Sequence, residues 1–147
     1  NGLPSNLSMS CDERKYINHG FKAVQIGASA YTAEALKHTM PASVFSRSTE
    51  CHNQDKVSMG TIAARDALRV MQLTEQVLAS TLLASVQGIR IRIENNQIEH
   101  DSMCKNVMNM YDDICGFFEP LIEDRPLDNL LRYTVDAIQS KRWNLYE

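Results

Sequence analysis

The residues best suited to chemistry lie together in the stretch Glu50-Cys-His-Asn-Gln-Asp-Lys-Val-Ser-Met-Gly60, which begins with two carboxylates, a thiol, an imidazole and two amides within six residues. If residues 49–55 turn helically, Glu50 and Gln54 share one face, because side chains four residues apart are neighbours on a helix. Such a carboxylate and amide can hold an ammonium group or orient a hydroxyl. The simpler alternative is a polar cap, in which Asp55 accepts hydrogen bonds from the free amides of the helix that follows.

Other kinds of site find less support in the sequence. Cys51 and His52 could suggest a thiol nucleophile and its base, but adjacent residues usually point apart, and a cysteine protease takes its histidine from elsewhere in the chain. The sequence contains no phosphate-binding loop and no GxSxG, HExxH or CxxC motif. The four histidines are dispersed, so we expect no metal site.

The segments around this stretch have helical periodicity, and none alternates apolar and polar residues as a half-buried strand would. A helix is predicted from about Gly20 to Met40, where Pro41 ends it because proline cannot donate the next helical hydrogen bond. Residues 41–55 are polar and are predicted to form a loop. Further helices are expected over about 57–92, 101–118 and 127–142, with a turn at 94–97. The sequence therefore predicts an all-α fold.

The predicted long helix divides a single helical unit (1–147) into motif-bearing loops with one helix (1–56), the long core helix itself (57–92) and a helical tail (93–147). At 1.5 Å per residue this helix would be roughly 50 Å long. It carries no charge between Glu75 and Arg90. We therefore expect other helices to surround it, with a partner chain supplying them if this chain cannot. Its uncharged run is too short to span a bilayer.

Composition narrows the class of protein further. A chain of 147 residues fits one domain, and its net charge of −3 argues against a nucleic-acid partner, which normally requires a basic face. The four cysteines lie far apart, as expected for reduced thiols in a cytoplasmic protein. No signal peptide is visible, and the chain begins Asn-Gly-Leu-Pro without a methionine, so we interpret it as an excerpt from a longer protein.

Three sets of motifs resemble the aromatic amino acid ammonia-lyase family, which includes phenylalanine, tyrosine and histidine ammonia-lyases and the related 2,3-aminomutases. They are Asn1-Gly-Leu-Pro-Ser-Asn-Leu7; Gly20-Phe-Lys; and the stretch from Glu50 to Gly60, followed by Ile62-Ala-Ala-Arg65 and Val86-Gln-Gly-Ile-Arg90. They occur in family order and cover roughly residues 1–92.

The resemblance implies a mostly helical homotetramer with a central bundle of long helices. It also implies a 4-methylideneimidazol-5-one (MIO) electrophile, formed from an internal Ala-Ser-Gly, that activates an aromatic L-amino acid for loss of ammonia. In the aminomutases the ammonia is added back at the β-carbon. This sequence contains no Ala-Ser-Gly, and Ala28-Ser29-Ala30 lacks the glycine. The family's catalytic tyrosine and substrate-binding arginine would also lie upstream. We therefore interpret the chain as a C-terminal portion and expect it to be inactive alone.

Three residues match family positions with a role. The resemblance implies that Glu50 binds or tunes the substrate amine as a catalytic residue, that Asn53 belongs to the substrate-binding wall, and that Gln54 bonds around the electrophile. Histidine-specific enzymes typically carry glutamate and histidine where Gln54 and Lys56 stand, which argues against histidine, although Val57-Ser-Met-Gly60 itself resembles those enzymes. The expected substrate is phenylalanine or tyrosine, converted to cinnamate or coumarate. The alternatives are a 2,3-aminomutase, a histidine ammonia-lyase, and a non-catalytic helical oligomerisation module.

Overall fold

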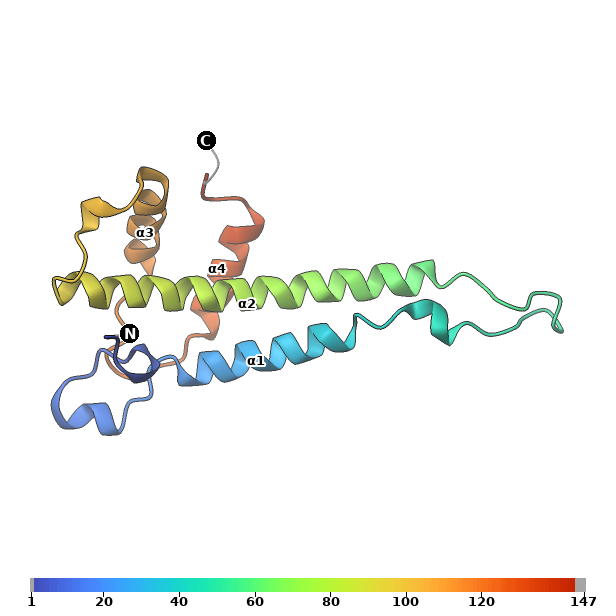
Figure 1. Ribbon diagram of the computed structural model, residues 1–147, viewed down its shortest axis with the longest axis horizontal. Helices are drawn as coiled ribbons and strands as arrows, with labels where there is room; N and C mark the ends of the chain where they lie inside the picture. Colours follow the sequence, from blue (N-terminus) through green and yellow to red (C-terminus); the bar gives the residue numbers. More distant parts are fainter. Residues whose placement is uncertain (1, 145–147) are drawn as a thin grey trace.

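The computed structural model describes residues 2–144, and within that range the regular secondary structure is helical, which confirms the all-α prediction (Figure 1). The four α-helices are α1 (Lys22–Lys37), α2 (Gly60–Glu94), α3 (Lys105–Phe117) and α4 (Asp128–Gln139). Short 3₁₀ helices lie at Ser5–Leu7, Asp12–Tyr16, Ala42–Phe45 and His100–Ser102.

Helices α1 and α2 lie side by side and run in opposite directions, and together they form an arm that extends away from the rest of the molecule (Figure 1). The buried residues of α2 begin only at Leu73, so its first three turns project beyond the body. Polar pairs join the two helices along this part of the arm. Arg69 donates hydrogen bonds from Nε and Nη2 to one carboxylate oxygen of Glu34, at 2.8 and 2.6 Å, and His38 contacts Asp66 at 3.2 Å.

The body packs α3 and α4 against α2, and α4 crosses α2 so that its first turn also lies near α1 (Figure 1). The segments before α1 and between α3 and α4 complete the body (Figure 1). Phe21, which precedes α1, meets Phe118 edge to face at a centroid distance of 6.1 Å. Both rings are buried, and each side chain of this size contributes about 1.5–3 kcal/mol by leaving water. The central cluster consists of Phe21, Leu83, Val86, Tyr111, Ile114, Phe118, Leu121 and Leu127.

Gln87 is a polar residue at the centre of this core and is completely buried. Its side-chain amide donates to the carbonyl oxygens of Leu7 and Leu121, at 3.1 and 3.2 Å, and its oxygen accepts the Leu121 amide at 3.3 Å. Buried polar groups must be hydrogen-bonded to avoid a desolvation penalty. Gln87 therefore holds two segments that are distant in sequence against α2.

The segment before α1 is anchored to the α3–α4 connection. The Asp124 carboxylate accepts the backbone amides of His19 and Gly20 at 2.8–2.9 Å, and the first of these bonds is the main cause of the lowered pKa of Asp124. Gly20 has φ +55°, and a Cβ there would lie 2.6 Å from the Asn6 carbonyl oxygen. Only glycine fits this position without displacing the backbone.

The helix boundaries correct several predictions. The long helix runs over 60–94 rather than 57–92, and its N-cap is Met59, without a side-chain cap. The prediction that Asp55 caps this helix is therefore wrong. The expected turn at 94–97 is confirmed: Asn96 has φ +54° and Gln97 donates to the Arg92 carbonyl, which closes a Schellman motif. Helix α3 begins later than expected because residues 100–102 form a separate 3₁₀ turn.

Candidate functional site

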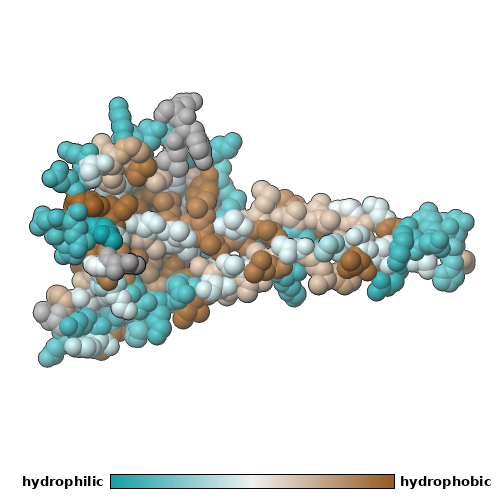
Figure 2. Space-filling model, in the orientation of Figure 1, coloured by the Kyte–Doolittle hydropathy of each residue, from teal (hydrophilic) through white to brown (hydrophobic). Residues whose placement is uncertain are grey.

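The candidate residues lie in an antiparallel hairpin loop at the far end of the arm, where the space-filling view shows a hydrophilic tip (Figure 2). Thr49 and Gln54 form a β-bridge, with amide-to-carbonyl distances of 3.0 and 3.3 Å. Between them Glu50, Cys51 and His52 all have φ between +54° and +69°. This left-handed backbone is uncommon for residues with a Cβ. The chain reverses here without a helical turn.

The predicted i, i+4 pairing of Glu50 with Gln54 on a helical face is therefore wrong. The structure instead brings Glu50 together with Asn53, whose side-chain amide donates to the Glu50 carboxylate at 3.3 Å. Gln54 is held through its backbone in the bridge, and its exposed side chain has no protein partner within residues 2–144. The tip thus presents a carboxylate oriented by an amide, and Gln54, the next residue in the chain, supplies a second exposed amide. Such a set can bind an ammonium group and donate to a carbonyl or ring nitrogen.

The hairpin is held by side chains from its own two strands. The Ser48 hydroxyl and His52 Nδ1 lie 2.8 Å apart across the tip. Nearer the helices, the Ser46 hydroxyl contacts both backbone groups of Val57 at 2.8 Å. Sequence reasoning missed Ser46, because a serine in a polar loop carries no pattern that distinguishes a buried hydroxyl from an exposed one.

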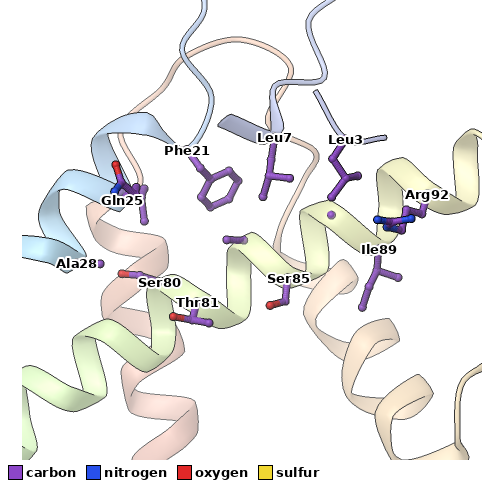
Figure 3. A pocket seen from close by; sticks show the side chains of 13 residues that line it. Leu3, Leu7, Phe21, Gln25, Ala28, Ser80, Thr81, Ser85, Ile89 and Arg92 are labelled. Carbon is purple, nitrogen blue, oxygen red and sulfur yellow. The ribbon is translucent and has the colours of Figure 1, made fainter. Parts of the chain in front are cut away.

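A cavity of about 470 Å³ lies elsewhere, in the body, between the N-terminal segment, α1 and α2 (Figure 3). Its apolar lining includes Leu3, Leu7, Phe21 and Ile89, and Arg92 lies at one end. None of the predicted site residues lines this cavity. The residues that the sequence suggests for chemistry all lie in the hairpin, and none of the residues that line the cavity is among them.

Perturbed titratable groups also lie in the body and serve its packing. His100 bonds to Asp101 through Nδ1 at 3.0 Å and to Asp112 through Nε2 at 2.7 Å, and these two carboxylates raise the pKa of His100. Arg142 forms a double hydrogen bond with Asp113 and lowers the pKa of that carboxyl. These pairs fasten loops to α3, away from the hairpin.

All four cysteines are free thiols. Across residues 2–144, no three His, Cys, Asp or Glu side chains gather closely enough to ligate a metal ion. No helix in that range has the length and apolar character needed to cross a membrane.

Comparisons with known proteins test the resemblance. The sequence profile of the family described as aromatic amino acid lyase matches residues 1–114. Histidine ammonia-lyase from Alkaliphilus oremlandii is 34% identical over 123 residues, which cover 80% of this chain and 24% of that protein. Phenylalanine aminomutase (L-beta-phenylalanine forming) from Taxus chinensis is 32% identical over 118 residues, covering 79% and 16% of the two chains. The crystal structure of tyrosine aminomutase from Streptomyces globisporus aligns with a TM-score of 0.81 and 29% identity, over 96% of this chain and 25% of that one.

The profile match extends over well more than half of the sequence. The chain belongs to the aromatic amino acid lyase family. The match reaches beyond the motifs, which end near residue 92, and the structural alignment includes most of the tail as well. The chain spans about a quarter or less of the length of the relatives it matches.

Proposed function

We propose that this chain is the C-terminal part of an ammonia-lyase that removes ammonia from phenylalanine or tyrosine, giving cinnamate or coumarate. The observation that carries the proposal is the hairpin tip, where Asn53 orients the exposed carboxylate of Glu50 and the next residue, Gln54, has an exposed side-chain amide. An α-amino acid presents an ammonium group, and a carboxylate at hydrogen-bond distance can bind it or take a proton from it.

The residues present fit the family's MIO group. Its ring carbonyl and nitrogens need hydrogen-bond donors and acceptors, and the Gln54 side chain offers both without competition from a partner in residues 2–144. When bound, MIO supplies an electrophile that makes the amino group of the substrate a better leaving group. With these roles, Gln54 would contact MIO, Asn53 would orient the Glu50 carboxylate, and Glu50 would bind the substrate ammonium. The Ala-Ser-Gly precursor is absent from this sequence, so the 147 residues alone should show no turnover.

The proposal includes a cytoplasmic homotetramer. Large apolar side chains are exposed along both helices of the arm, and brown patches mark apolar residues along it in Figure 2. On α2 these are Ile62, Leu68, Met71 and Leu78, each about half exposed or more. Leu68, Met71 and Leu78 fall on one face of α2, and exposed apolar side chains of this kind support burial against other helices, which copies of the same chain would supply.

Two related activities have specific support. The similarity to phenylalanine and tyrosine aminomutases favours a 2,3-aminomutase as one alternative. The similarity to histidine ammonia-lyases supports histidine as the alternative substrate. Gln54 and Lys56, which stand where histidine-specific enzymes carry glutamate and histidine, still make phenylalanine or tyrosine our first choice. A purely structural oligomerisation module would make no use of an oriented carboxylate at the tip.

The experiment is to incubate the whole protein with L-phenylalanine, L-tyrosine and L-histidine separately and to identify the products. Cinnamate or coumarate alone supports the lyase, a β-amino acid indicates the aminomutase, and urocanate indicates histidine as the substrate. Replacing Glu50→Gln should lower turnover at least about tenfold, since positioned acid–base groups contribute roughly 10²–10⁴-fold. Glu13→Gln, at an exposed position in the body, is the matched control. Full activity of Glu50→Gln would remove Glu50 from the site.

A further inference from the structure

Ser46 is buried in the connection between α1 and α2, unlike the residues on either side of it. It is only 3% exposed, whereas residues 43–45 and 47–56 are all exposed. Its hydroxyl donates to the Val57 carbonyl oxygen and accepts the Val57 amide, both at 2.8 Å. A single side chain thus satisfies both backbone groups of a residue on the opposite strand of the hairpin.

The position of this contact matches the register of the hairpin. Ser46 lies three residues before Thr49, and Val57 lies three residues after Gln54. Paired residues of an antiparallel hairpin move outward in equal steps, so Ser46 and Val57 fall opposite each other in the register that the bridge defines. The serine hydroxyl takes the place of the backbone groups that a neighbouring strand would supply.

This register decides where the tip residues point. A slip of one residue in an antiparallel pair moves each side chain to the opposite face. The Thr49–Gln54 bridge has only two hydrogen bonds and is exposed, and an isolated two-stranded hairpin is marginal in water. The bridge therefore needs a second constraint nearer the helices, and the buried Ser46 contact provides one.

We infer that Ser46 is a positioning residue that fixes the register of the hairpin and thereby the direction of the Glu50 carboxylate. This inference rests on the proposed function for its catalytic consequence. Ser46 touches neither Glu50 nor the proposed substrate, so its effect on turnover must pass through the hairpin backbone. A displacement of about 1 Å at a reacting group can cost roughly a hundredfold in rate.

The test compares Ser46→Ala with the control Ser43→Ala, an exposed serine on the same arm, in the whole protein. Hydrogen exchange measured by mass spectrometry on peptides covering 46–57 should be faster in Ser46→Ala and unchanged in Ser43→Ala. With the aromatic amino acid that the protein converts, kcat of Ser46→Ala should fall at least about tenfold. Ser46→Thr keeps the hydroxyl and should recover most of the activity. Ser46→Cys, nearly the same size, replaces Ser46→Ala if the alanine variant does not fold.

A double-mutant cycle with Glu50→Gln separates positioning from general destabilisation. If Ser46 acts through Glu50, adding Ser46→Ala to Glu50→Gln should lower kcat by less than about twofold, because interacting residues are not additive. An equal loss in both backgrounds, or hydrogen exchange over 46–57 that matches the control, would overturn the inference. Full activity of Glu50→Gln would instead contradict the proposed function. The hydrogen-exchange rates over 46–57 would still show whether Ser46 holds the hairpin.

Discussion

Replacing Gln87 by alanine is expected to loosen two segments that are remote from each other in sequence. The Gln87 amide serves the carbonyl oxygens of Leu7 and Leu121, and its oxygen serves the Leu121 amide. The Leu121 carbonyl keeps a second donor, the Met9 amide at 3.4 Å. The Leu121 amide is left without this partner in a residue that is only 2% exposed.

The cost can be worked from these contacts. An orphaned buried amide costs about 1–3 kcal/mol, and each of the two lost bonds to carbonyl oxygens contributes about 0.5–1.5 kcal/mol. The sum is about 2–6 kcal/mol, before the cavity that alanine leaves behind. Gln87→Leu fills most of that cavity but leaves the same amide unpaired, so it should recover only part of the loss.

Hydrogen exchange by mass spectrometry on the whole protein measures the effect where it is expected. Peptides covering residues 3–9 and 118–122 should both exchange faster in Gln87→Ala, and the melting temperature should fall. Gln72→Ala, at an exposed position on the same helix, is the control and should change neither quantity. If Gln87→Ala behaves like Gln72→Ala, or if only one of the two segments loosens, the reasoning from this hydrogen-bond set is refuted.

Three further predictions concern helix ends and pH. Lys141→Gly should raise the melting temperature, because Lys141 has φ +54° after α4 and glycine removes a conformational cost of about 1 kcal/mol. Asn96→Gly should raise the melting temperature less, since asparagine tolerates this backbone. An equal rise in both variants would contradict the explanation. The raised pKa of His100 means that its pair of carboxylates stabilises the fold below pH about 6.5 and that this contribution is lost as pH rises through the folded-state pKa. The melting temperatures of His100→Gln and the parent protein should therefore differ most near pH 5.5 and least near pH 8. A difference that stays constant between these pH values would argue against linkage. The lowered pKa of Asp124 has the opposite sign: Asp124→Asn should destabilise near neutral pH, and the difference should disappear as pH falls through the folded-state pKa.

The helices of this fold could be predicted because they have a strong period. The helix expected to reach Met40 ends at Lys37, and the long helix was placed within three residues at each end. The error at its start has a physical cause. Ser46 engages both backbone groups of Val57, so the chain cannot begin its helical hydrogen bonds until it has passed that residue. A cap at Asp55 is then too far from the first turn to act.

The hairpin itself could not be predicted from the sequence. Its three left-handed residues are Glu50, Cys51 and His52, of which only histidine is enriched in that backbone, and the loop contains no glycine that would signal a tight turn. The family resemblance suggested which residues to consider, and their role stays a prediction, but their arrangement had to come from the structure. It pairs Glu50 with Asn53, whereas the spacing of the sequence suggested Gln54.

Because the first turns of α2 are not buried, a small tilt of the arm moves the hairpin at its end. From Gly60 to Gln72 the helix projects about 20 Å beyond its first buried residue, Leu73, and carries the hairpin at its end. A tilt of roughly 3° over that length moves the tip by about 1 Å, which is enough to change a reaction rate up to roughly a hundredfold.

Stiffness and stability then become separate properties of the same contacts. The Arg69–Glu34 and His38–Asp66 pairs are partly exposed, and polar pairs of this kind add little to the free energy of unfolding. As cross-braces between two helices, however, they limit the bending of the arm. On the proposed function, their removal would leave the melting temperature almost unchanged and still lower the turnover at the far end.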